Sequence, residues 1–292
     1  MKYDSLRVLA ERAQEAHLNI SDIVIEDQMV ALDSTYEEVY ARMAYNLQVM
    51  KESVISGMEK DLRSTSGLTG GDAYKMSRRQ DNNITGGTFI SALTKAIAVA
   101  ETNACMGRIV AAPTAGSCGI LPACVLTVME DHHIQEDKAI KALFTASAVG
   151  MVIARNATVS GAEGGCQAEC GSASAMAAAA ITEMSGGTPE MVEHACAMAL
   201  KNVLGLVCDP VAGLVEIPCI KRNAMGTANA FTAAEMALAG ITSAIPADEV
   251  IWSMKKIGDS MHSDLKETAR GGLAATPTGR KLTEKVFGKM EE

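Results

Sequence analysis

Aromatic residues are scarce in this sequence: they make up 3% of the chain, whereas apolar residues as a whole make up 48%. Strands favour β-branched and aromatic side chains, but small residues and unbranched methionine suit closely packed helices. Alanine is abundant here, and there are 18 methionines. The composition therefore predicts an all-α protein.

Three further features are missing. Basic residues are not in excess, because 26 Lys and Arg stand against 35 Asp and Glu, and nucleic-acid binding requires a basic face. The longest apolar run, Leu143–Ala154, falls well short of the roughly 20 residues of a membrane helix. Met1–Asp4 lead into a charged helical pattern, not a signal segment. We therefore expect a cytoplasmic protein that binds neither nucleic acid nor membrane.

No repeat, linker or low-complexity run divides the chain. We expect one helical domain over residues 1–292, in which residues 1–60 form packing helices and residues 61–292 form the core that carries the chemistry. Thr35 and Glu38 fit a capping box that opens a helix over residues 35–58. Its apolar residues recur every three or four positions, which is typical of one buried helix face.

Local signals predict the later helices. Thr188 followed by Pro189 is a strong helix start, and this helix should run to about Leu206 and deliver Cys208 at its end. The alanine-rich residues 172–183 must pack closely against their neighbours. Further helices are expected after the break at 85–88, over about 121–130 and 136–155, from just after Asn223 to about Gly240, and from 246.

The eight cysteines lack the paired spacing of a zinc finger, in which close pairs occur twice. Cys166 lies in the glycine-rich stretch 161–167, and Cys208 and Cys219 bracket a segment with two prolines. Glycine and proline disfavour a regular helix and let backbone approach a ligand closely. Three thiolates on irregular backbone suit an iron–sulfur cluster. The alternative is that they are ordinary buried cysteines, because free cysteine is among the most buried residue types.

Cys170 is the rival ligand, because a continuous helix would place it on the same face as Cys166. The remaining cysteines lie in apolar or helical settings and are expected in the core or just outside the site: Cys105, Cys118, Cys124 and Cys196.

Two loops combine glycines with hydroxyl side chains just before an expected helix. Backbone N–H groups in such loops can hold a carboxylate or phosphate, although the same composition also marks plain turns. Two of them in one chain fit an amino-acid substrate whose carboxylate must be held. The candidate substrate-binding residues are Ser66, Gly67, Thr69 and Gly70 in the first loop, and Thr114, Gly116 and Ser117 in the second.

Three motifs carry a family resemblance: Gly161–Met176, Cys208–Asn223 and Ala111–Ser117. They closely resemble the iron–sulfur-dependent L-serine dehydratases, and the chain looks like the alpha chain of the two-subunit form. The likeness runs from about Ser66 to Gly279. In that family three cysteines hold a [4Fe-4S] cluster, and the positions that match them here are Cys166, Cys208 and Cys219.

The resemblance implies a lyase of amino-acid degradation and gluconeogenesis that converts L-serine to pyruvate and ammonia. Three cysteines leave one iron of the cluster open, and that iron would act as a Lewis acid on the serine hydroxyl. A base must remove the α-proton. Lys75, which belongs to the matching first-loop motif, is our candidate, because burial or nearby cations can tune a lysine for this task. His262 and an iron-bound hydroxide are the other possibilities.

Rival functions follow from the same residues. A pyridoxal-phosphate dehydratase would catalyse the same net reaction. However, the sequence shows no βαβ alternation, and the three cysteines would have no functional role in such an enzyme. An electron-transfer or interaction subunit would want a fourth cysteine on the cluster. Cysteine desulfhydration on a similar cluster is the neighbouring enzyme activity.

Two expectations concern what completes the protein. The two-subunit form pairs this chain with a beta chain that carries a regulatory domain, so a hetero-oligomer is implied. No cysteine follows Cys219, and the sequence closes with Lys285–Glu292. The fourth iron should therefore meet water, a weaker non-thiolate group or the partner chain. The glycine- and threonine-rich stretch 267–279 should return to pack near the site.

Overall fold

The computed structural model describes residues 3–288, so the last four residues of the closing segment lie outside it. Within this range every regular element is a helix, and the only β pairing is an isolated bridge between Cys208 and Lys266. The predicted all-α class is confirmed. The same residues contain no helix that is both long and apolar enough to cross a membrane.

Thirteen α-helices are joined by four shorter helical turns within residues 3–288. The α-helices are α1 (Leu6–Ala16), α2 (Ile20–Leu32), α3 (Tyr36–Gly57), α4 (Asp72–Ser77), α5 (Gly87–Ala104), α6 (Ile120–Asp131), α7 (Glu136–Asn156), α8 (Gly161–Gly164), α9 (Ser172–Met184), α10 (Pro189–Lys201), α11 (Cys219–Leu238), α12 (Ala247–Ser260) and α13 (Pro277–Phe287). The turns are a π-helical turn η1 (Gln167–Gly171) and the 3-10 turns η2 (Val211–Gly213), η3 (Ser263–Leu265) and η4 (Gly272–Ala275).

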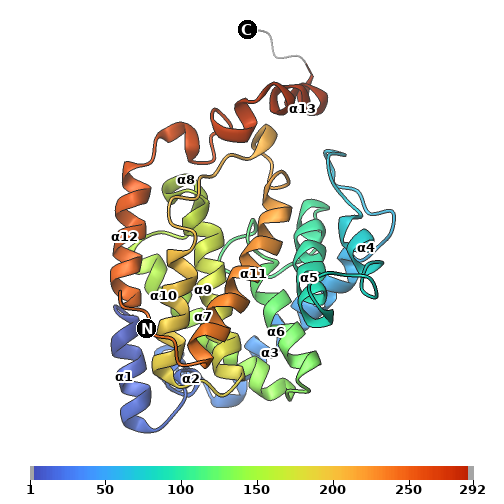
Figure 1. Cartoon of the computed structure of the whole chain (residues 1–292). Coiled ribbons are helices and arrows are strands. Elements are labelled where there is room, and N and C mark those ends of the chain that lie inside the picture. The colour runs from blue at the N-terminus through green and yellow to red at the C-terminus, as the bar shows by residue number, and fades with distance from the viewer. Residues whose placement is uncertain (1–2, 289–292) are drawn as a thin grey trace.

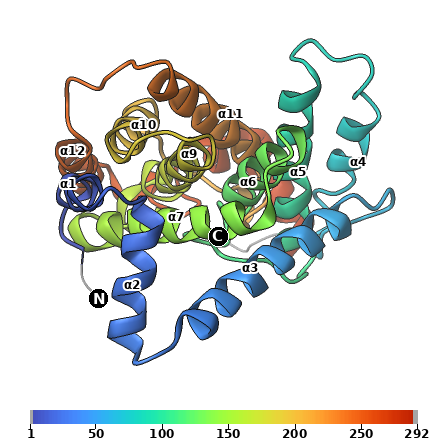
Figure 2. The ribbon, with the colours of Figure 1, turned by 90° about the horizontal axis from the view of Figure 1, so that it is seen from below.

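The alanine-rich helix α9 is the centre of the fold. Seen from below, it is surrounded by α6, α7, α10 and α11 (Figure 2). All of its residues except Glu183 are buried, and most of them are alanine or serine. Small side chains let neighbouring helices approach closely, and packing density in such a core is high. The close packing predicted for residues 172–183 is confirmed.

Helix starts follow the predicted local signals. Thr35 accepts the backbone N–H of Glu38 and completes the capping box at the start of α3. Thr188 accepts the N–H of Met191 at the start of α10, with Pro189 in the first turn. Each hydroxyl satisfies an N–H group that has no partner inside its helix.

The end of α10 differs from the prediction. The helix stops at Lys201 and does not continue to about Leu206. Gly205 adopts a left-handed backbone with φ 85°, and its N–H donates to the side-chain oxygen of Gln167 (2.9 Å). The N–H of Gln167 donates in turn to the carbonyl of Leu206 (2.9 Å). A turn bound to the Cys166 region therefore replaces the last turns of the expected helix.

The chain beyond α12 returns across the top of the bundle and ends in α13 (Figure 1). Cys208 donates its N–H to the carbonyl of Leu265 (2.9 Å) and accepts the N–H of Glu267 (2.8 Å). This short pairing lays the carboxyl-terminal segment directly over one of the candidate ligands. The expected return of this segment to the site is confirmed.

Candidate functional site

The three candidate cysteines come from separate segments and are all buried. Cys166 immediately precedes the π turn η1, Cys208 lies in the extended stretch between α10 and η2, and Cys219 is the first residue of α11. Their exposed fractions are 2%, 3% and 7%. Burial, followed by the negative charge of Cys166, raises the pKa of both the Cys208 and Cys219 thiols, the latter to about 12. The charge of Cys166 therefore acts on the thiols of both Cys208 and Cys219.

Cys166 has the opposite pKa shift. Its Sγ lies 3.3 Å from the Sγ of Cys170, and this hydrogen bond, together with the positive charge of Arg222, lowers the pKa of the Cys166 thiol. A thiolate is the form of cysteine that binds metal. Cys170 is buried beside Cys166, as the rival-ligand hypothesis requires, although the turn between them is π-helical.

The remaining cysteines lie in the helical core or near it, as expected. Three of them are fully buried and point their thiols at backbone carbonyls of neighbouring helices: Cys118 towards Val99, Cys124 towards Thr227 and Cys196 towards Ala175. Cys105 is half-buried at the end of α5.

The donor atoms of the candidate site are thiols, which are the usual protein ligands of iron–sulfur clusters. Across residues 3–288, no three His, Cys, Asp or Glu side chains converge as the ligands of one metal ion do. A [4Fe-4S] cluster binds each cysteine through a different iron, so its ligand sulfurs stand further apart than those around one ion. Three buried thiols, one of them beside a cation, provide the kind of donor atom that such a cluster binds.

The second predicted loop is fastened to the start of α11. The side chain of Asn223 donates to the carbonyl of Gly116 (2.8 Å) and to that of Cys219 (2.9 Å), and its oxygen accepts the N–H of Gly119 (2.8 Å). A side-chain amide thus holds the loop within reach of Cys219. Asn223 itself is fully buried.

A carboxylate from the π turn occupies the hydroxyl cluster of this loop. The hydroxyl of Thr114 donates to Glu169 and lies 3.0 Å from the hydroxyl of Ser117. Gly116 lies so close that a Cβ there would be 2.5 Å from Oε1 of Glu169. Burial raises the pKa of Glu169, partly offset by the Thr114 hydrogen bond.

The first predicted loop holds carboxylates in the same way. Thr69 donates to the buried Glu216 (2.5 Å), three residues before Cys219, which brings the loop to the site. At the start of α4, the N–H groups of Asp72 and Ala73 donate to the buried Glu101 (2.9 and 3.1 Å). The hydroxyls of Ser64 and Ser66 pair with each other (3.2 Å), and the backbone turns at Gly67 and Gly70 with positive φ.

Both loops therefore bind carboxylates of the chain itself, and their binding of a substrate carboxylate stays a prediction. The sequence did not single out Glu101, Glu169 and Glu216, because a single glutamate in a sequence is usually a solvated side chain. One signal was available for Glu169. It is the only charged residue between positions 164 and 182, in a stretch of glycine, alanine, serine and cysteine.

One thiol and two carboxylate oxygens also lie near Gly161 without forming a metal-ligand group in the described part of the chain. A Cβ at this glycine would lie 3.0 Å from Sγ of Cys208, 3.3 Å from Oε2 of Glu267 and 3.5 Å from Oε2 of Glu169. Glycine is needed here for space, because its φ is not in the left-handed region. Glu267 was likewise not anticipated, and the return of the carboxyl-terminal segment is what brings it in.

Lys75 lies at the rim of the site. Its side chain is 72% exposed and pairs with Asp72 (2.8 Å), which also pairs with Lys221 on α11. This ion-pair chain joins α4 to the helix that begins at Cys219, but it leaves Lys75 outside the group of buried cysteines. His262 is exposed and lies beside Asp264.

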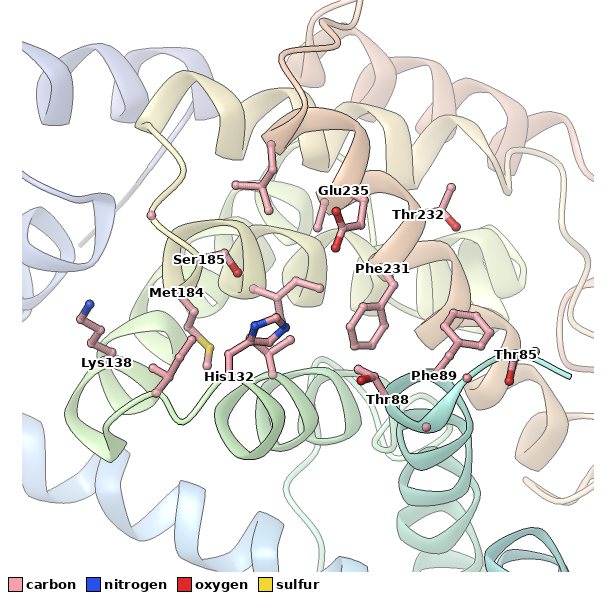
Figure 3. A pocket seen from close by; sticks show the side chains of 18 residues that line it. Thr85, Thr88, Phe89, His132, Lys138, Met184, Ser185, Phe231, Thr232 and Glu235 are labelled. Atoms are coloured by element: carbon pink, nitrogen blue, oxygen red, sulfur yellow. The ribbon is translucent and has the colours of Figure 1, made fainter. Parts of the chain in front are cut away.

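A separate cavity of about 890 Å³ lies at the other end of α9 and α11 from the cysteines (Figure 3). Phe89 and Phe231 form apolar walls, and His132 and Glu235 contribute polar groups. Its walls come from the start of α5 and the ends of α6, α9 and α11. The predicted site is thus distinct from this cavity.

Comparison with known sequences gives a consistent picture. Residues 15–274 match the family described as serine dehydratase alpha chain. A probable L-serine dehydratase alpha chain of Bacillus subtilis (strain 168) is 53% identical over 288 residues, which cover 98% of this chain and 96% of the relative. The L-serine dehydratase alpha chain of Peptoniphilus asaccharolyticus is 42% identical over 281 residues, with 96% of each covered.

Longer relatives match as well. L-serine dehydratase 2 of Escherichia coli (strain K12) is 38% identical over 288 residues, which are 93% of this chain and 61% of the relative. The similar region is therefore one part of a longer polypeptide in that protein.

Proposed function

Because the chain belongs to the serine dehydratase alpha-chain family, we propose that it is an L-serine ammonia-lyase that forms pyruvate and ammonia with the help of a [4Fe-4S] cluster. One observation supports this most. Three buried cysteines from three distant segments meet at the start of α11, where both glycine-rich loops are also anchored. This arrangement provides thiolate ligands and anion-binding backbone in one place.

Cys166, Cys208 and Cys219 are the proposed cluster ligands. When bound, the cluster supplies an open iron that acts as a Lewis acid towards the substrate hydroxyl. Burial keeps water from the three thiols and raises the pKa of Cys208 and Cys219, so binding of the cluster must displace their protons. Cys219 begins α11, so the positive end of that helix lies beside its sulfur, and Arg222 provides a full positive charge near Cys166.

The two loops are proposed to hold and orient serine through Ser66, Gly67, Thr69, Gly70, Thr114, Gly116 and Ser117. Their hydroxyl and N–H groups suit the substrate carboxylate, as their pairing with internal glutamates illustrates.

Lys75 is the proposed base for the proton on Cα. Its neutral Nζ takes that proton, and the C–H electron pair forms the Cα=Cβ bond while the C–O bond breaks. The departing hydroxyl keeps the C–O electron pair and takes a proton from the Lys75 ammonium to leave as water. The enamine that is released then hydrolyses to pyruvate and ammonia. The amino group of Lys75 pairs with Asp72 (2.8 Å), so Lys75 must leave this ion pair and lose its own proton before it acts as the base.

A beta chain is the proposed partner. The relatives that this chain matches over almost its whole length are named alpha chains, and the Escherichia coli relative contains further sequence in the same polypeptide. Co-expression with the beta chain of the same organism should yield a complex that stays together on size exclusion. Two separate species would contradict this assignment.

The ligand assignment is tested by anaerobic purification, followed by iron, sulfide and pyruvate assays with L-serine and, in parallel, L-cysteine. Replacing Cys166, Cys208 or Cys219 singly with alanine should abolish stable iron binding and pyruvate formation. The matched control is Cys196→Ala, a buried cysteine of the helical core, which should retain iron. Full cluster occupancy in Cys208→Ala would refute the ligand set, and iron without serine turnover would favour the electron-transfer alternative.

A further inference from the structure

Arg222 connects the start of α11 to the segment that carries Cys208. It lies three residues after Cys219, in the first turn of the helix. Its Nη1 donates to the carbonyl of Val207 (2.9 Å), and its Nη2 donates to Oδ1 of Asp209 (2.8 Å). These two acceptors flank Cys208 on either side. One side chain therefore fixes the backbone that presents this thiol.

The same guanidinium also reaches the third cysteine. Together with the hydrogen bond to Cys170, the positive charge of Arg222 lowers the pKa of the thiol of Cys166, which precedes the π turn. Arg222 thus binds the segment of Cys208 and acts electrostatically on Cys166, while it belongs to the helix of Cys219. Its planar group with five N–H donors suits this task, because it can bind several acceptors at fixed angles.

Asp209 holds Arg222 in place from the opposite side. The side chains of Arg222 and Asp209 are only 15% and 5% exposed. The second carboxylate oxygen of Asp209 accepts the N–H of Leu273 (2.9 Å). Gly272 packs against this carboxylate with φ +58°, and a Cβ there would lie 2.5 Å from Oδ2. The ion pair therefore also attaches the carboxyl-terminal segment above the site.

A buried ion pair is costly to desolvate and contributes little net stability, so its value lies in fixing one arrangement. The neighbouring residue shows the contrast. Lys221 is exposed and pairs with Asp72 on α4, away from the cysteine-bearing segments. Of the two adjacent cations that follow Cys219, only Arg222 is directed at the cysteines.

We propose that Arg222, held by Asp209, is a positioning residue that sets the spacing of the three cysteine thiols for the cluster. This inference rests on the proposed function, because the cluster is what the spacing serves. Lysine would keep the charge at this position, but it could not make the two hydrogen bonds to Val207 and Asp209 at the same time in the same geometry. The geometry, and not the charge alone, should therefore matter.

The experiment compares Arg222→Lys, Arg222→Met and Asp209→Asn with Lys221→Met as the matched control, all in the full chain reconstituted without oxygen. The measurements are iron and sulfide per chain, the rate of iron release to a fixed excess of chelator, and the visible circular dichroism of the cluster. Melting of the iron-free proteins reports folding separately. Changes around the ligands of a metal site cost about 10–100-fold in affinity. We expect at least the lower end of that range in release rate for both Arg222 variants.

Lys221→Met should release iron at the wild-type rate. Arg222→Lys should change the visible dichroism while its iron-free form melts like wild type, a combination that a purely structural role would not produce. Should Arg222→Met fail to fold, Arg222→Lys and Asp209→Asn still decide the outcome. Wild-type release and an unchanged spectrum in these variants would overturn this inference alone. Wild-type protein without iron and sulfide would overturn the proposed function as well.

Discussion

The contact between Gly116 and Glu169 shows how a single residue controls this site. The glutamate accepts the Thr114 hydroxyl because residue 116 has no side chain to push it away. The backbone of Gly116 is not in the left-handed region, so the requirement here is for space and not for an unusual φ.

Gly116→Ala should therefore impair serine binding without removing the cluster. A Cβ 2.5 Å from Oε1 would displace the carboxylate from Thr114 and distort the loop. Loss of a hydrogen bond to a charged group costs about 1.5–3 kcal/mol, which corresponds to an increase in KM of about 10–100-fold if the loop holds serine. Steady-state kinetics and iron content measure the two effects. Unchanged kinetics would reduce the loop to a plain turn.

Glu193 on α10 allows a test of buried charge remote from the cysteines. It is buried and accepts the N–H of Ala247 (3.4 Å), and burial raises its pKa above the ordinary value of 4.5. A raised folded-state pKa means that the carboxyl contributes stability below the unfolded pKa, and that this contribution is lost as pH rises through the folded value.

Glu193→Gln has no such titration. The free energy of unfolding of wild type relative to this variant should therefore fall over the range from pH 4.5 into the mildly alkaline region. Urea unfolding across that range measures the difference. The control is Glu190→Gln, which removes an exposed carboxylate from the same helix. A difference that rises with pH would contradict the assigned direction.

At the scale of whole helices, starts were easier to predict from the sequence than ends. The hydroxyls of Thr35 and Thr188 cap N–H groups three residues away, so the signal is contained in four adjacent residues. The end of α10 depends instead on Gly205 and on Gln167, which lies 38 residues earlier in the chain. No local pattern contains that contact, and this is why the predicted end at about Leu206 was wrong.

Helix packing gives a prediction of its own at the crossing of α3 and α5. Gly57 lies against the backbone of Ala98, and a Cβ on it would be 1.9 Å from the carbonyl oxygen of that residue. Gly57→Ala must push the two helices apart, at a cost of about 1–3 kcal/mol or more.

Gly87→Ala is the matched control, because its Cβ would meet open space in the first turn of α5. That change should be neutral or stabilise by up to about 1 kcal/mol. Thermal unfolding of the two variants measures the contrast. Equal melting temperatures would show that the helices at this crossing separate without cost.

At the scale of the whole molecule, local signals in the sequence indicated which cysteines to consider, but not the contacts that surround them. Glycine and proline neighbours singled out Cys166, Cys208 and Cys219, because those signals are local. The ion pair joins Arg222 to Asp209, which is 13 residues earlier in the chain, and the turn η2 lies between them. Partners of this kind are set by the tertiary fold, and neither spacing nor composition reports them.

The fold also explains why the site needs the whole chain. The central helix α9 follows the π turn after Cys166, α11 begins with Cys219, and the segment beyond α12 closes over Cys208. The ligands therefore come together only when the bundle is assembled and its carboxyl-terminal segment has returned. Cluster binding should accordingly stabilise the folded chain, because a ligand that binds only the folded state shifts the equilibrium towards it.

The central claim is that three cysteines of this chain hold a four-iron cluster whose remaining iron is open to L-serine. Mössbauer spectroscopy of the anaerobic, ⁵⁷Fe-labelled protein with and without L-serine tests it most directly. The account predicts a [4Fe-4S] spectrum in which the signal of a single iron site shifts when serine is added, while Cys208→Ala lacks the spectrum. Four iron sites that are all unaffected by saturating serine, or a chain that binds no cluster, would contradict it.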